Sequence, residues 1–167
     1  MISGRAIELL KTFSEDEFKQ FGLFLNSPFF NREKILFKFY TAVKKFHPFF
    51  DGRGFKKERI FSKLYPGKKY NDTRMRNVLS GILRRAQEFL AIISIQKDSF
   101  NLNTALMTEL AERKQKKLFR KNETLAVNYI DNLPVKDESY YNRMFILGNL
   151  KEKFNKSQGS TFSIKNN

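Results

Sequence analysis

The segment from residue 72 to 95 constrains the fold most, because its apolar residues recur at intervals of three and four. This spacing places them on one face of an α-helix, whereas a half-buried strand would alternate strictly. The same helical geometry places Asn77, Ser80, Gly81 and Arg84 on the opposite face. We therefore predict a central helix that buries one wide apolar stripe against neighbouring helices, formed by Met75, Val78, Leu79, Ile82, Leu83, Ala86, Phe89, Leu90 and Ile93.

Local start and stop signals predict further helices on the N-terminal side of this segment. Ser14 and Glu17 have the spacing of a capping box, which begins a helix. Pro28 ends that helix, and Asn31 is expected to cap a second long helix. Pro48 ends the second helix, because the residue before a proline avoids the helical region.

Similar signals lead into the central helix. Apolar residues at helical spacing predict a short helix over residues 57–65, and Pro66-Gly67 then predicts a turn. Asn71 or Asp72 is placed to cap the central helix that follows.

The C-terminal part continues with helical periodicity. Residues 98–103 indicate a polar break, after which we expect a helix over 104–116 and a helical run over 118–130. Leu133-Pro134 ends that run, and Asp137-Glu138 begins a last helix. The residues of this last helix that we expect to face inward are Tyr141, Phe145, Ile146 and Leu150.

No segment alternates with period two for more than a few residues, so the sequence predicts an all-α chain. We expect an N-terminal helical domain over residues 1–97. The start of an array of helical hairpins, similar to a solenoid, is expected over 98–156. Residues 157–167 are rich in Ser, Asn, Gly and Lys, which predicts a disordered tail.

Composition excludes several classes of site. The chain has no cysteine and a single histidine, His47, which excludes disulfides, thiolate zinc sites, cysteine nucleophiles and multi-histidine metal sites. No apolar run approaches the ~18 residues that a membrane span needs. Charged side chains throughout the first twenty residues argue against a signal peptide. We expect a cytoplasmic protein with no metal, cofactor, membrane partner or small-molecule substrate.

Two phrases of the sequence resemble a known family. Ser27-Pro28-Phe29-Phe30-Asn31 follows the first capped helix, and Ile60-Phe61 leads through Tyr65-Pro66-Gly67 to Tyr70. Together with ELAERKQKKLFRK and the 137–141 run, this pattern resembles a family of all-helical proteins without an assigned activity that recurs in Bacteroidota. The resemblance covers most of residues 7–150 and implies a helical fold. Members of that family continue with more helices, so we expect this chain to be a fragment.

Residues 57–90 are also similar to the helix-turn-helix part of bacterial transcriptional activators with winged-helix domains. The similarity lies in a short helix, the turn Leu64-Tyr65-Pro66-Gly67 and an arginine-bearing helix. It implies contact with DNA. No β-hairpin wing is expected after Ile95, because the chain returns directly to helical periodicity.

Basic residues are concentrated in the middle of the chain. The formal net charge is +15, and residues 51–100 hold 12 Lys and Arg against 5 Asp and Glu. A helix that begins after a turn offers free amides to phosphate, and Lys and Arg release counterions from nucleic acid. The alternative is a solvated basic face in a chain of Lys-rich composition. The candidate nucleic-acid-binding residues in the basic region 66–85 are Lys68, Lys69, Arg74, Arg76, Arg84 and Arg85.

Other candidate sites have simpler interpretations. The pairs Phe29-Phe30 and Phe49-Phe50 lie beside basic residues, as in single-strand binders. Because the chain has 19 Phe and no Trp, we interpret both pairs as core residues. His47 lies at a predicted helix end, and the acids of residues 15–17 lie in a first helical turn, where each suits the helix dipole. We therefore predict no catalytic residues.

These observations favour a non-enzymatic interaction or scaffold module that binds an unidentified protein partner. Helical arrays present surfaces that take up partner helices or extended segments. The alternative is a DNA- or RNA-binding regulator that uses the basic region 66–85.

Overall fold

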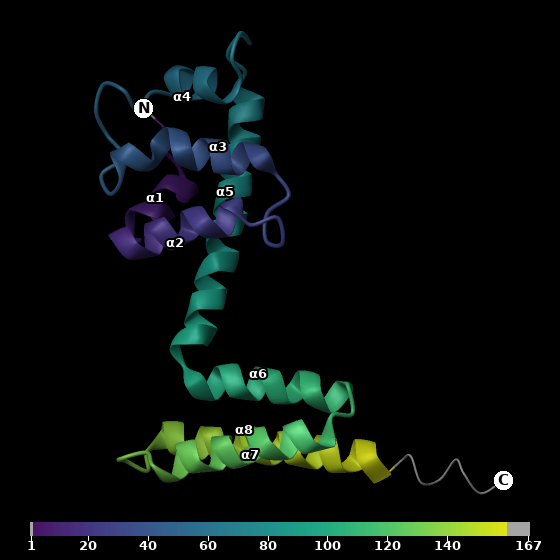
Figure 1. Ribbon diagram of the computed structural model, residues 1–167. Coiled ribbons are helices and arrows are strands. Elements are labelled where there is room, and N and C mark those ends of the chain that lie inside the picture. The colour runs from purple at the N-terminus through teal and green to yellow at the C-terminus, as the bar shows by residue number, and fades with distance from the viewer. Residues whose placement is uncertain (1, 160–167) are drawn as a thin grey trace, which may run out of the picture. The chain divides into compact units, whose positions relative to one another are not determined.

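The computed structural model describes residues 2–159, and every regular element in this range is helical (Figure 1). The predicted all-α class is therefore confirmed. The elements are α1 (Arg5–Lys11), α2 (Glu15–Asn26), α3 (Lys34–Val43), the 3-10 helix η1 (Lys44–Phe46), α4 (Lys57–Leu64), α5 (Asp72–Lys97), α6 (Ser99–Glu112), α7 (Lys116–Asp131) and α8 (Glu138–Gly159).

The chain divides into two compact units, the first ending at Ile93 and the second beginning at Ser94. The division falls in the last turns of α5, slightly before the boundary at residue 97 that the sequence suggests. Each unit has its own hydrophobic core.

In the first unit, α2 packs against α3 and α3 packs against α4, while α5 crosses this stack (Figure 1). Phenylalanine fills much of the core, because the chain has no tryptophan. The ring of Phe89 from α5 lies 5.5 Å from Phe21 and 5.7 Å from Phe13 and Phe24, measured between ring centroids. The apolar stripe of α5 is therefore covered by α2 and its neighbours, as predicted.

The prediction from helical periodicity is wrong for one residue of α5. Gly81 is buried, not turned away from the core. A Cβ atom at Gly81 would lie 2.9 Å from Leu36 Cδ2 of α3, so the missing side chain allows the two helices to approach. Helical periodicity alone could not predict that Gly81 is buried. It shows which residues share a face of α5, but not how wide a face the neighbouring helices cover.

The predicted caps have mixed outcomes. Ser14 forms the complete capping box with Glu17, and the Asn71 side chain accepts from the backbone amide of Arg74. Asn31 does not cap α3, since Glu33 holds the N-cap position. Asn31 is instead buried, and its amide nitrogen donates to the carbonyl oxygens of Leu25 and Glu33.

In the second unit, α6 and α7 form a hairpin and α8 contacts both helices. The predicted polar break over residues 98–103 is wrong. Asp98 accepts hydrogen bonds from the backbone amides of Phe100 and Asn101, so it caps α6 directly. The rings of Phe119 from α7 and Phe154 from α8 stack with centroids 3.9 Å apart.

The predicted inward face of α8 is only partly right. Ile146 and Leu150 pack against the core, but Tyr141 and Phe145 are exposed. Leu147 and Phe154 supply the buried positions instead. The predicted tail is also corrected in part, because α8 continues through residues 157–159, and the rest of that segment lies outside the described residues.

Candidate functional site

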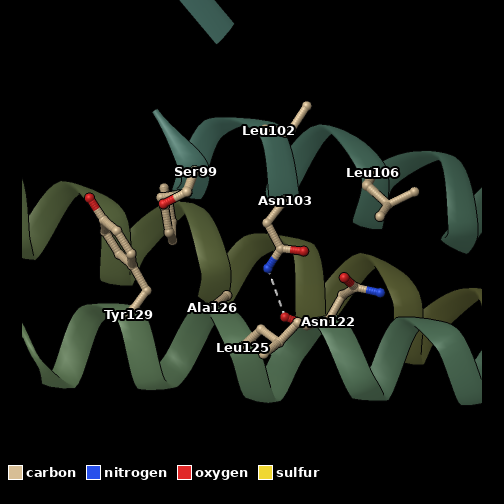
Figure 2. Close-up of a pocket in the computed structure, with 9 residues that line it drawn as sticks. Ser99, Leu102, Asn103, Leu106, Asn122, Leu125, Ala126 and Tyr129 are labelled. Carbon is tan, nitrogen blue, oxygen red and sulfur yellow. Dashed lines mark hydrogen bonds between the residues drawn. The ribbon is translucent and has the colours of Figure 1, made fainter. Parts of the chain in front are cut away.

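A groove between α6 and α7 is the candidate site of the second unit (Figure 2). Its volume is about 350 Å³, and apolar side chains dominate its walls. Every side chain that lines it is uncharged, namely Ser99, Phe100, Leu102, Asn103, Leu106, Asn122, Leu125, Ala126 and Tyr129. We call it the α6–α7 groove.

The groove follows from the way the two helices divide their apolar residues. Met107 of α6 and Ala126 of α7 are buried in the core. Leu102 and Leu106 are four residues apart, so they share a second face of α6 that the core does not cover. Leu125 of α7 is likewise exposed. A second apolar face therefore remains along the hairpin after the core is filled.

The side-chain nitrogens of the two asparagines in the groove donate to backbone carbonyl oxygens of α7. The Asn103 side chain donates to the carbonyl oxygen of Asn122 at 2.8 Å and ties α6 to α7, as Figure 2 shows. The Asn122 side chain donates to the carbonyl oxygen of Leu118. Because these amides are engaged, the surface offered to a ligand is mainly apolar.

One end of the groove is held by an arginine of α8. Arg143 donates to the Tyr129 hydroxyl at 3.0 Å and to the Asp98 carboxylate at 3.3 Å. Its guanidinium carbon lies 5.0 Å from the Tyr129 ring centroid and 5.6 Å from that of Phe100. This arrangement fixes two aromatic walls of the groove by charge-assisted and cation–π contacts.

The sequence analysis does not predict a site at this groove. Leu106 and Leu125 lie in the helical segments predicted over 104–116 and 118–130, and Leu102 lies in the predicted break over 98–103. A usable signal was present, because Leu102 and Leu106 form a row distinct from Phe100, Met107 and Leu110. That row predicts a second apolar face once α6 is known to begin at Ser99.

The six predicted nucleic-acid residues fall into two groups that differ in their ion pairs. Arg84 pairs with Glu33 of α3 at 2.7 Å, and Arg76 pairs with Asp72 at 3.1 Å. Arg85 pairs with Glu88 at 2.5 Å, and its buried Nε has no hydrogen-bond partner among the described residues. These three arginines therefore make contacts within the first unit.

The remaining three predicted residues have no carboxylate partner within residues 2–159. Lys68 and Lys69 are exposed in the loop before α5. The Arg74 guanidinium carbon lies 5.9 Å from the Tyr65 ring centroid. The structure thus leaves a smaller basic cluster of Lys68, Lys69 and Arg74 at the start of α5.

A carboxylate beside this cluster has a perturbed pKa. The Tyr70 hydroxyl donates to Asp72 Oδ1 at 2.8 Å, and this hydrogen bond, with Lys57 and Arg76 nearby, lowers the pKa of Asp72. Desolvation, together with the bond to Asp72, raises the pKa of Tyr70 to about 12. The hydrogen bond between Tyr70 and Asp72 links the loop before α5 to the first residue of that helix.

The interpretation of the two phenylalanine pairs as core residues is right for Phe50 alone, which is buried. Phe30 stacks on Phe24 with ring centroids 4.7 Å apart, but it is still 37% exposed. Phe29 and Phe49 are 86% and 73% exposed. Three of the four rings are therefore accessible to solvent.

The residues considered for catalysis have structural roles. His47 stacks on Phe18 with centroids 4.2 Å apart, and its Nε2 lies 3.0 Å from the carbonyl oxygen of Phe13. The acids of residues 15–17 occupy the first turn of α2. In the described part of the chain, no three His, Asp or Glu side chains gather where they could hold a metal ion.

Comparisons with protein-family models, curated proteins and solved structures found no match to this chain. The similarities to the Bacteroidota family and to helix-turn-helix activators therefore stay predictions. None of the helices in residues 2–159 combines the length and apolar character that crossing a membrane requires. The cytoplasmic location stays a prediction as well.

Proposed function

We propose that this chain is a non-enzymatic protein-interaction module whose α6–α7 groove binds the apolar face of a helix from a partner protein. The observation that carries the proposal is the lining of the groove, which is mainly apolar and carries no charge, and in which both asparagine nitrogens are hydrogen-bonded within the hairpin. Covering the leucines of such a surface is favourable because it removes apolar area from water. The lining offers no carboxylate, imidazole or amine for acid–base chemistry.

A helix suits this groove better than an extended segment. An extended segment gains affinity from main-chain hydrogen bonds to an open sheet edge, which a helical hairpin lacks. A helix satisfies its own backbone and presents apolar side chains at positions i, i+3, i+4 and i+7. Two antiparallel helices also form the long trough into which such a row fits.

The experiment compares two leucines of the same helix. Random peptides displayed on phage are selected against the full chain, and the enriched peptides are synthesised for binding measurements. Leu125 lines the groove and is 53% exposed, whereas Leu118 lies outside it and is 49% exposed. We expect Leu125→Glu to weaken binding about tenfold or more, because it places a charge against the apolar face.

Leu118→Glu is the matched control, and we expect it to bind like the wild type. Equal binding by Leu125→Glu and the wild type would overturn the proposal. Enriched peptides without apolar residues at helical spacing would overturn it as well.

Nucleic-acid binding by the basic region remains the alternative proposal. It is supported by Lys68, Lys69 and Arg74, which are near the α5 N-terminus and lack carboxylate partners in the described residues. It predicts that duplex or single-stranded DNA binds with steep salt dependence. The triple variant Lys68→Glu, Lys69→Glu, Arg74→Glu abolishes that binding if the alternative holds. Absence of binding at low salt excludes it.

A further inference from the structure

A second hollow lies in the first unit, between the end of α2, the loop that follows and the start of α3. Its volume is about 500 Å³. Leu25, Pro28 and Phe37 supply its apolar wall, and Arg32, Lys34 and Lys38 lie at the same site. We call it the α2–α3 hollow. It contains no residue of the α6–α7 groove and none of the basic region 66–85.

The loop beside this hollow is firmly held. The Asn31 side chain donates to the carbonyl oxygen of Leu25 at 2.8 Å and accepts from the Glu33 amide at 3.0 Å. The Asn31 backbone amide also donates to the carbonyl oxygen of Ser27. Because both sides of the loop are tied to one buried side chain, the hollow is formed before any ligand binds.

The cations of the hollow lack internal counter-charges. Arg32, Lys34 and Lys38 are exposed, and none has a carboxylate partner among residues 2–159. Glu33 lies between two of them in sequence, but its carboxylate pairs with Arg84 of α5 at 2.7 Å. No carboxylate lines the hollow. An apolar socket is therefore bordered by three positive charges, and no carboxylate in the described part of the chain pairs with any of them.

From this complementarity we propose that the α2–α3 hollow binds an acidic segment of a partner protein. One large apolar side chain of the segment packs against Pro28 and Phe37. Carboxylates on either side of that anchor pair with Arg32, Lys34 and Lys38. Lys34 and Lys38 are four residues apart on α3, so they present their ammonium groups along one side of the helix.

The wall of the hollow favours an acidic peptide over a nucleic acid. Single-strand binders stack bases on open aromatic faces. Phe37 is partly buried and stacks on Tyr40, with centroids 6.1 Å apart and ring planes 18° apart. The rest of the apolar wall is aliphatic, from Leu25 and Pro28. Such a wall suits a leucine or phenylalanine anchor.

The test measures binding of labelled probes to the full chain by fluorescence anisotropy. The first probe is a peptide of about twelve residues with Glu on both sides of a Phe-Leu pair. A second probe has Gln for every Glu, a third has Ser for the Phe-Leu pair, and a fourth is single-stranded oligo-dT of similar charge. We expect the first probe to bind about tenfold tighter than each of the others.

Two double variants with the same change of net charge locate the binding. We expect the double variant Lys34→Glu, Lys38→Glu to bind the first probe about tenfold more weakly than the wild type does. Lys44→Glu with Lys63→Glu is the control, because both lysines are exposed, unpaired within residues 2–159 and outside the hollow. We expect the affinity of this control variant for the first probe to stay within about twofold of the wild-type affinity.

Three results would overturn the proposal. Equal loss in both double variants would mean that net charge alone attracts the peptide. If the probe with Ser in place of the Phe-Leu pair binds as tightly as the first probe, the apolar socket does not contribute to binding. Tighter binding of oligo-dT, lost in the Lys34 and Lys38 variant, would assign the hollow to nucleic acid. None of these results bears on the α6–α7 groove, so the two proposals fail separately.

Discussion

The ring of Tyr40 in α3 lies directly across the backbone of Gly22 in α2. A Cβ atom at Gly22 would come within 2.4 Å of Tyr40 Cζ, so any other residue forces the ring to move. The ring is not free to move, because it packs against Phe18 at 4.9 Å and Phe37 at 6.1 Å between centroids. Gly22 therefore sets how closely α2 and α3 pack, and with it the shape of the α2–α3 hollow.

Gly22→Ala is predicted to destabilise the first unit. Overpacking costs about 1–3 kcal/mol, while alanine gains up to about 1 kcal/mol of helix propensity over glycine. With the full propensity gain subtracted, we expect a net loss of up to about 2 kcal/mol, measured as the free energy of unfolding in urea.

Gly148→Ala is the matched control for that change. Gly148 is in the middle of α8, and a Cβ atom there would meet nothing within 4 Å. We expect this variant to gain up to about 1 kcal/mol from propensity alone. Equal effects of the two substitutions would contradict the close approach of Tyr40 to Gly22.

Phe89→Ala is predicted to cost about 3–5 kcal/mol of unfolding free energy, because it leaves a cavity among three other phenylalanine rings. Leu79→Ala is expected to cost less, about 1–2 kcal/mol, because Leu79 is only partly buried. Urea denaturation of both variants shows which one loses more unfolding free energy. A larger loss at Leu79 would show that the α5 stripe faces another way.

Glu123 joins α7 to α8, and its charge is predicted to stabilise the second unit. Its carboxylate accepts from Arg120 at 2.7 Å and from Lys151 at 2.8 Å. Burial opposes ionisation, but these two hydrogen bonds outweigh it and lower the pKa of Glu123 below its usual 4.5. We expect Glu123→Gln to cost about 1 kcal/mol at neutral pH.

The sign of the pH dependence follows from the lowered pKa. The stabilisation is present above the unfolded-state pKa and is lost as pH falls through the folded-state pKa. Wild type and Glu123→Gln are therefore expected to converge in stability in acid. Glu112→Gln is the control, because Glu112 is exposed and makes no ion pair among the described residues. A stability difference that persists unchanged below the folded-state pKa would contradict the assignment.

Removal of the Tyr70 hydroxyl is predicted to raise the pKa of Asp72. The bond from Tyr70 is the largest cause of the lowered pKa, so Tyr70→Phe moves it back towards its usual 3.8. Carboxyl ¹³C chemical shifts recorded against pH measure the change. Tyr65→Phe removes a nearby hydroxyl that makes no bond to Asp72 and is expected to leave the pKa as it is. If the pKa of Asp72 is the same in Tyr70→Phe as in the wild type, the hydrogen bond from Tyr70 is not what lowers it.

Features that depend on neighbouring residues in the chain could be predicted from the sequence. The Ser14 capping box and the Asn71 cap each involve residues three positions apart, and the apolar spacing of α5 is visible along one segment. Faces covered by distant segments could not be predicted. Gly81 is buried only because Leu36 crosses it, and Phe145 is exposed because Leu147 and Phe154 contact the hairpin instead.

The candidate sites were harder to predict for the same reason. Arg84 appeared free in the sequence, but its partner Glu33 is 51 residues away. Asn31 looked like a helix cap, and only the fold shows that it holds the loop beside the α2–α3 hollow. The spacing of Leu102 and Leu106 indicates a helical face, but not that this face stays uncovered.

Amide chemical-shift mapping tests the central claim most directly. The ¹⁵N-labelled full chain is titrated with the tightest peptide selected against it. The account predicts that the largest shifts fall at residues 99–106 of α6 and 122–129 of α7, and that Leu125→Glu removes them while Leu118→Glu leaves them in place. Largest shifts in the basic region 66–85, or shifts that survive in Leu125→Glu, would contradict the claim that this groove is the binding site.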